Sequence, residues 1–363
     1  MVIEQIRWWR TSFGKEEANQ ICNSIEHEYI SQGPVTAEFE EKIAKFLGVP
    51  YVVVTTSGSI AILLALMAAG IRPDDEVIVP NRTWIATAHA PLILGAKVRL
   101  GDVELTRPLM DVTQIENLIT PRTKAIIPVH LNGRSVDMRE VHRIAQKNDL
   151  IIIEDAAQAL GSRNEDGFLG TQSDMGCFSL SVSKIISTGQ GGFVVTKNEN
   201  LYKKLVAIRT HGVSDIINAQ WTQLGFNFRF TDILASIGIH QINRLPERIE
   251  KVNKIYKRYE TGIKDLPFIK LIPVDIKKGE IPIYIETLCP DREKLIKFLA
   301  AHSIETRPFY PDLNLAPYFE NAERFPNSEV FGNQGLFLPS GPVQSMENID
   351  RVINTLKKFK DNT

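Results

Sequence analysis

The stretch that decides the fold reads GCFSLSVSK at residues 176–184 and continues as IISTGQGGFVVT at residues 185–196. Two short apolar runs, typical of strands, flank a polar turn rich in serine and glycine. The turn contains a single lysine, Lys184, shortly after the first run. We therefore expect Lys184 to be presented at the end of a strand rather than packed in the core.

A second stretch places an acid and an amide at the end of another strand. Residues 150–153 (LIII) predict a buried strand, and EDAAQ follows at residues 154–158. In α/β sheets, ligands bind at the carboxyl ends of the strands. A lysine that can condense with a carbonyl and an acid that can hold a ring nitrogen protonated are the groups that pyridoxal phosphate requires. Lys184 and Asp155 together therefore predict this cofactor.

The combination of EDAAQ at 154–158, FSLSVSK at 178–184 and the following glycine pair resembles the DegT/DnrJ/EryC1/StrS family of sugar aminotransferases. The resemblance extends from about residue 14 to about residue 353. It implies an α/β protein with the type I fold of pyridoxal-phosphate enzymes. In that fold a large domain has a mainly parallel sheet flanked by helices, and a small C-terminal domain is α+β. We expect the large domain, with an N-terminal helical lead-in, at residues 1–245 and the small domain at residues 246–363.

The bulk composition argues against several classes of function. The chain has 363 residues and a formal net charge of −1, and its basic residues form no stripe, so nucleic acid is not an expected partner. No run approaches the roughly twenty apolar residues of a membrane span, and the first residues lack the pattern of a signal peptide. We expect a cytoplasmic protein with no membrane partner. Three scattered cysteines, Cys22, Cys177 and Cys289, predict neither a disulfide framework nor a metal site.

A candidate phosphate site lies near the N-terminus. Residues 51–55 (YVVVT) predict a strand, and TSGS at 56–59 opens an apolar helix expected at 60–69. A helix start that follows a strand and a polar turn can bind an anion, because its first N–H groups are unpaired. Gly58 and Ser59 are therefore candidate phosphate ligands. An ordinary serine cap is the alternative.

Two further residues follow predicted strands. Trp84 comes after the strand expected at 74–80 and could stack on a flat cofactor ring. Core packing is the alternative for a lone tryptophan, and the resemblance favours the stacking role. His130, in VHLNG at 129–133, matches a Val-His-x-x-Gly pattern of the family. For this histidine, an active-site contact and a satisfied, partly buried side chain stay equally open.

Strands and helices alternate along most of the chain, which favours a parallel sheet wrapped by helices. Further strands are expected at 97–100, 124–128 and 282–288. Helices are expected at 15–29, 36–47, 85–94, 112–119, 137–147, 201–209, 231–259 with a break near Pro246, 291–301 and 347–358.

The resemblance implies roles for three of these residues in the chemistry. Lys184 is expected to hold the cofactor covalently and to move protons as a general acid and base. Asp155 is expected to keep the ring nitrogen protonated by opposite-charge attraction. Gln158 is expected to donate a hydrogen bond to the ring hydroxyl. Helix capping by residues 154–155 is the structural alternative.

The resemblance also implies how the cofactor phosphate is held. Ser179 is expected to bind it together with Gly58 and Ser59. Asn227, in GFNFR at 225–229, is expected to reach the phosphate of the neighbouring subunit. The expected active unit is therefore a homodimer with shared sites.

The implied reaction moves an amino group from L-glutamate to a keto or aldehyde sugar, often nucleotide-linked. Its expected purpose is to make amino sugars for surface polysaccharide, lipopolysaccharide or a secondary metabolite. Candidate substrate residues are Arg10, His130, Arg229, Arg307, Tyr310 and Asn314.

Two departures from the family pattern leave the sugar open: Ser181 stands where histidine or tyrosine is common, and Asn314 stands where histidine is common. Lys184 argues against the dehydratases of this fold, which carry histidine there. A non-catalytic sensor or regulator that keeps the fold is the alternative from another class. That alternative does not explain the intact set of Lys184, Asp155, Gln158 and Ser179.

Overall fold

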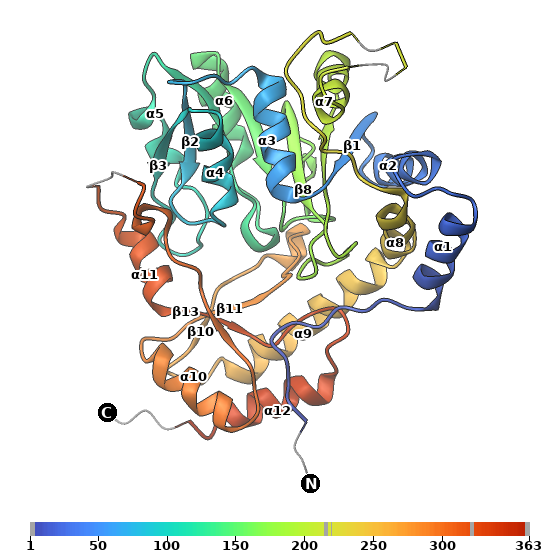
Figure 1. The fold of residues 1–363 in the computed structure, drawn as a ribbon. Helices are drawn as coiled ribbons and strands as arrows, with labels where there is room; N and C mark the ends of the chain where they lie inside the picture. The colour runs from blue at the N-terminus through green and yellow to red at the C-terminus, as the bar shows by residue number, and fades with distance from the viewer. Residues whose placement is uncertain (1–3, 214–216, 219, 320–322, 360–363) are drawn as a thin grey trace.

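The structure, a computed structural model, describes residues 4–213, 217–218, 220–319 and 323–359. Figure 1 shows a large α/β part, coloured blue to yellow, above a smaller part that contains the orange and red elements. The long helix α9 (Leu245–Ile263) runs along the boundary between them.

A seven-stranded sheet with the order β1-β9-β8-β5-β4-β2-β3 forms the centre of the large part. Its strands are β1 (Tyr51–Thr55), β2 (Glu76–Pro80), β3 (Lys97–Gly101), β4 (Thr123–Ile126), β5 (Ile151–Asp155), β8 (Met175–Ser179) and β9 (Gly192–Thr196). Among the described strands of this sheet, β9 alone runs in the opposite direction. The predicted α/β fold with a mainly parallel sheet is confirmed.

Both faces of the sheet are covered, which explains why its strands read as continuous apolar runs. All five residues of β2 and of β9 are buried. Helices α3 (Gly58–Ala69), α4 (Ala86–Ile93) and α7 (Glu199–Arg209) bury apolar side chains against one face. Helices α5 (Ile115–Leu118) and α6 (Met138–Asn148) cover part of the other face.

The N-terminal helices form a separate layer beside the sheet. Helices α1 (Lys15–Glu26) and α2 (Pro34–Leu47) pack against α8 (Asp232–Asn243) (Figure 1). The buried carboxylate of Asp232 accepts hydrogen bonds from the backbone N–H groups of Gly33 and Thr36, each at 2.8 Å. This carboxylate therefore joins the start of α2 to the start of α8.

The smaller part has its own antiparallel sheet, in the order β10-β11-β13-β12, and its own core. Its elements are β10 (Lys270–Leu271), β11 (Ile285–Leu288), α10 (Arg292–Ala301), β12 (Arg307–Pro308), α11 (Pro326–Gln334), β13 (Gly335–Leu338) and α12 (Met346–Leu356). The chain's first described residues also reach this part, because Ile6 pairs with Ile304 and Trp9 with Ser340. The domain boundary at residues 245 and 246 stays a prediction.

Several elements differ from their predicted limits. The first helix stops at Glu26 rather than at residue 29, and the helix expected at 112–119 is a 3-10 turn (Val112–Gln114) followed by the short α5. The long helical pattern divides between Asn243 and Leu245, close to the expected break. The two-residue strands β6 (Arg163–Asn164), β7 (Gly167–Phe168), β10 and β12 were not predicted, because alternation cannot be recognised over two residues.

Across the described ranges, no helix is both long and apolar enough to cross a membrane.

Candidate active site

A cavity of about 470 Å³ lies at the carboxyl ends of β1, β2, β5 and β8 and is closed on one side by the smaller part. Seven predicted cofactor residues line it: Gly58, Ser59, Trp84, Asp155, Gln158, Ser179 and Lys184. Two of the predicted substrate residues, Arg307 and Tyr310, line it as well. The motifs quoted from separate parts of the sequence therefore meet at one edge of the sheet.

Lys184 lies in the loop that connects β8 to β9, and three contacts fix this loop. The Lys184 N–H donates to the carbonyl of Ser181 at 3.0 Å. The Trp9 indole N–H donates to the Val182 carbonyl at 3.0 Å, and the Tyr284 hydroxyl donates to the Ser183 carbonyl at 2.9 Å. The lysine is half-buried beside a loop backbone that Trp9 and Tyr284 hold in place.

Asp155 ends β5 and is buried in the cavity wall. Its carboxylate accepts a hydrogen bond from Thr87 Oγ1 at 2.7 Å and another from the Ala157 N–H at 3.1 Å. Burial raises the pKa of Asp155, although these two hydrogen bonds and the positive charge of Lys184 oppose the rise. Since burial penalises an unpaired carboxylate, a positively charged group in the cavity would be stabilised beside it.

The two polar groups of the Gln158 side chain have different roles. Its side-chain oxygen accepts from the Asn132 N–H at 3.0 Å, so its amide NH₂ is left to donate. The Tyr310 phenol hydrogen-bonds with Gln158, and burial raises the pKa of Tyr310. The Asn132 backbone contact thus orients an amide donor at the cavity wall.

The start of α3 packs closely on the end of β8. Ser57 caps the helix by accepting from the Ile60 N–H at 3.2 Å. A Cβ added at Gly58 would lie 2.7 Å from Ser179 Cβ, and one added at Gly192 would lie 2.5 Å from the Gly58 nitrogen. Glycine is required at both positions, because any side chain would push the helix start away. The free N–H groups of the first turn and the Ser179 side chain then border the same cavity.

This set of groups fits pyridoxal phosphate. The unpaired N–H groups at the start of a twelve-residue helix suit a phosphate. The buried carboxylate of Asp155 suits a protonated ring nitrogen, and the Trp84 side chain, 55% exposed, offers an uncovered aromatic face. The Lys184 amine is the nucleophile that an aldehyde requires.

Comparison with known proteins agrees with this fit. The profile of the DegT/DnrJ/EryC1/StrS aminotransferase family matches residues 11–357. The chain belongs to this family. The resemblance seen in the sequence is confirmed, and the protein is an enzyme, a sugar aminotransferase of amino-sugar biosynthesis that uses pyridoxal phosphate.

Relatives of this aminotransferase cover nearly its whole length. It is 33% identical to GDP-perosamine synthase of Escherichia coli O157:H7 over 355 residues, which cover 97% of each chain. It is 29% identical to the spore coat polysaccharide biosynthesis protein SpsC of Bacillus subtilis, over 95% of this chain and 94% of that protein. The structure of S. venezuelae DesV in complex with a ketimine intermediate superimposes with a TM-score of 0.94 at 28% identity, over 99% of this chain and all of that one.

Asn227 and four of the predicted substrate residues do not line the cavity of the described chain. Asn227 is exposed, and its side-chain oxygen accepts from Arg229 Nε at 3.0 Å. Arg10 is also exposed. Asn314 binds Asn81 instead, with its N–H donating to Asn81 Oδ1 at 3.0 Å. Their predicted contacts with the cofactor or the substrate therefore stay predictions.

His130 is fully buried, which favours the satisfied histidine of the two alternatives left open by the sequence. Its Nδ1 accepts from the Val136 N–H at 3.3 Å, so Nε2 carries the proton and donates to Glu154 at 2.9 Å. Neither Glu154 nor Asp155 caps a helix, because β5 continues into turns. The capping alternative is wrong for both.

Sequence reasoning missed several residues of the wall. Thr87 supports Asp155, and Trp8 and Tyr284 line the cavity from the N-terminal segment and the smaller part. Thr87 lies three residues after Trp84, a spacing that places two side chains on one side of a helix start and could have indicated it. Trp8 and Tyr284 had no such signal, because only the tertiary structure brings them to the cavity.

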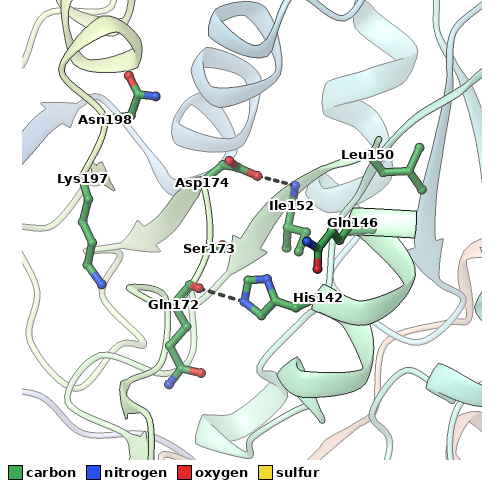
Figure 2. A pocket seen from close by; sticks show the side chains of 10 residues that line it. His142, Gln146, Leu150, Ile152, Gln172, Ser173, Asp174, Lys197 and Asn198 are labelled. Carbon is green, nitrogen blue, oxygen red and sulfur yellow. Dashed lines mark hydrogen bonds between the residues drawn. The ribbon is translucent and has the colours of Figure 1, made fainter. Parts of the chain in front are cut away.

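A second hollow, of about 580 Å³, lies at the opposite edge of the sheet. Figure 2 shows Lys197, Asp174 and His142 around it. The His142 Nε2 is 2.8 Å from the Gln172 carbonyl, and Asp174 Oδ2 accepts from the Ile152 N–H at 2.9 Å. These polar groups already bind the backbone around them.

Proposed function

We propose that this aminotransferase takes the amino group of L-glutamate and transfers it to a nucleotide-linked keto sugar, in a site built around Lys184. The observation that carries the proposal is the meeting of Lys184, Asp155 and the start of α3 at one cavity. Bound pyridoxal phosphate supplies the carbonyl that accepts amines and the ring that withdraws electrons.

The residues of the chain divide the remaining work. Lys184 Nζ would hold the cofactor and, as a free amine, would move the proton of the carbon that bears the amino group. Asp155 would place its negative charge against the ring nitrogen, and Thr87 orients its carboxylate. Gln158 would donate to the ring hydroxyl. The N–H groups at Gly58 and Ser59 would bind the phosphate together with the Ser179 hydroxyl.

The sugar substrate is proposed from the relatives and from the cavity mouth. One relative is a GDP-perosamine synthase, which favours a substrate that carries a nucleoside diphosphate. Arg307 lines the cavity, with its guanidinium 4.5 Å from the centre of the Trp8 ring and 56% of its side chain exposed. An exposed guanidinium at the mouth can bind a phosphate or a carboxylate. A cytoplasmic location also belongs to this proposal, and cell fractionation checks it.

We test the reaction on the purified protein loaded with cofactor. Addition of L-glutamate is expected to replace the visible absorption band with that of the pyridoxamine form. A GDP-linked keto sugar should then restore the first band and yield an amino sugar, detected by mass spectrometry. A non-catalytic regulator would keep its band unchanged with every donor and sugar.

The dimer is part of the proposal, because Asn227 is exposed and does not line the cavity of its own chain. In a dimer that mixes Lys184→Ala with Asn227→Ala subunits, one site carries both changes and the other carries neither. Random mixing should therefore restore roughly a quarter of wild-type activity. If verified mixed dimers stay as inactive as the parent variants, Asn227 acts within its own chain or not at all.

A further inference from the structure

Arg82 is a buried cation that the reaction scheme does not use. It follows the end of β2, two residues before Trp84, and is 1% exposed. Its guanidinium forms an ion pair with Asp312, which is itself buried, and donates to the Tyr310 carbonyl at 2.8 Å. A single side chain of the large part therefore binds two points of the segment that carries Tyr310.

Asn81, the residue before Arg82, also binds the segment that carries Tyr310. Asn81 Nδ2 donates to Asn314 Oδ1 at 3.0 Å, and the Asn314 N–H donates back to Asn81 Oδ1 at 3.0 Å. The Leu313 N–H donates to the Asn81 carbonyl at 3.0 Å. The end of β2 and residues 310–314 are thus joined by a continuous set of buried or half-buried hydrogen bonds.

The same guanidinium lies on the aromatic rings of this segment. Its Cζ is 5.1 Å from the centre of the Tyr310 ring and 5.2 Å from the centre of the Phe309 ring, within the range of a cation–π contact. Tyr310 in turn meets Trp84 edge to face, with ring centres 5.7 Å apart and planes at 85°. Arg82 therefore contacts the Tyr310 ring directly, and it lies two residues before Trp84 in the chain.

Trp84 and Tyr310 both line the cavity, and they come from opposite parts of the molecule. We propose that Arg82 is a positioning residue that sets the separation of Trp84 and Tyr310, and through it the fit of the sugar over the cofactor. This inference rests on the proposed function for its kinetic consequence. Its structural consequence, a fixed pair of rings, does not depend on turnover.

A second buried ion pair between the two parts provides a matched control. Arg134 pairs with Glu286 and donates to the Pro273 carbonyl at 2.8 Å, and both charged side chains are at most 1% exposed. Neither residue lines the cavity. A change at Arg134 therefore reports the general cost of disturbing a buried pair between the parts, without disturbing the two rings.

The first measurement uses the protein without substrates. The chain has four tryptophans, so 5-fluorotryptophan labelling gives four ¹⁹F signals, and Trp84→Phe identifies that of Trp84. Arg82→Lys keeps the charge but cannot bind both partners while lying flat on a ring. We expect Arg82→Lys and Asp312→Asn to shift or broaden the Trp84 signal, and Arg134→Lys to leave it in place. A Trp84 signal unchanged in Asp312→Asn, which lies on the far side of the ion pair, would overturn the inference.

The second measurement separates binding of the sugar from the first half of the reaction. In Arg82→Lys and Asp312→Asn we expect the KM for the keto sugar to rise about tenfold. The rate of the glutamate half-reaction should stay within about threefold of wild type. Arg134→Lys should lower Tm about as much as Arg82→Lys and Asp312→Asn do, and should leave the KM for the keto sugar unchanged. If Arg82→Lys and Asp312→Asn lower only Tm, as the control does, Arg82 is structural and does not position the rings. If wild type fails to transaminate, the proposed function fails while the fluorine result still decides the geometry.

Discussion

The two edges of the central sheet carry similar side chains in very different settings. At the carboxyl edge, Lys184 is half-buried and Asp155 is buried in the wall of the 470 Å³ cavity. At the other edge, Lys197 and Asp174 are exposed around the hollow of Figure 2. Because β9 runs antiparallel to β8, the lysine that follows β9 emerges at the edge opposite to Lys184.

The difference lies in what burial does to each charge. Asp174 faces water and binds the Ile152 N–H, so its charge is already accommodated. Asp155 is removed from water, and burial raises its pKa despite two hydrogen bonds. A carboxylate whose charge is destabilised by burial is stabilised most when a positively charged ligand binds beside it. Size alone does not separate the two hollows, since the exposed one is the larger.

The largest expected effect tests the lysine at the carboxyl edge. Lys184→Ala should slow transamination by about 10²–10⁴-fold, because the general acid and base is lost. Borohydride reduction of wild type should fix the cofactor mass to the peptide that contains Lys184, as read by mass spectrometry. Attachment to Lys197, or a normal rate in the alanine variant, would disprove the assignment of the site.

Asp155→Asn is expected to reduce activity by about 10²-fold, on the scale of a lost electrostatic contact to the reacting group. The cofactor-free variant should be no less stable than wild type. Since the folded pKa of Asp155 is raised, the wild-type protein loses stability as pH rises from the ordinary value of 3.8 through that pKa. Asparagine cannot ionise and avoids this loss. Thermal unfolding of both cofactor-free proteins at pH values from 3.8 upward checks the stability, and kinetics at neutral pH check the activity. Near-normal turnover in Asp155→Asn would show that Asp155 is not the partner of the ring nitrogen.

Its neighbour Glu154 should behave in the opposite way, with an effect on stability. Burial alone would raise its pKa, but hydrogen bonds from His130, Ser173 and the Gly170 N–H lower it overall. Glu154→Gln replaces one acceptor oxygen by a donor that faces other donors, and should cost about 1–3 kcal/mol.

The lowered pKa of Glu154 also predicts an acid dependence. The ionised carboxylate stabilises the fold fully above the ordinary value of 4.5, and this stabilisation is lost as pH falls through the lower folded pKa. Urea unfolding at a series of pH values should show a smaller acid loss in Glu154→Gln than in wild type. Equal acid profiles in the two proteins would show that Glu154 is not the group responsible.

The smallest effect is expected at the opposite edge. Lys197→Ala removes an exposed charge from the hollow of Figure 2 and should change stability by no more than about 0.5 kcal/mol. Its kcat and KM should equal those of wild type. A loss of activity in this variant would mean that the second hollow communicates with the cavity, and the contrast between the two edges would fail.

The sequence predicted the strands that carry the site because their apolar runs are long and end in polar residues. The run that precedes Asp155 and the run that precedes Ser179 both occur within two residues of their expected positions. What the sequence could not provide was the direction of each side chain relative to the cavity. Asn314 was a candidate substrate residue, yet its side chain binds Asn81. Trp8 and Tyr284 reach the cavity through packing between distant segments, which no local pattern encodes.

The first described residues pair with segments near the end of the chain, so they can complete their contacts only late in synthesis. The Trp8 N–H donates to Glu305 Oε2, 297 positions later in the chain, and Trp9 pairs with Ser340. Ribosomes make a chain from its N-terminus at about 5–20 residues per second, so this segment waits many seconds for its partners. Trp8 takes its place in the cavity wall only when synthesis is nearly complete. A nascent chain that has formed the whole central sheet therefore still has a cavity open on the side that Trp8 closes.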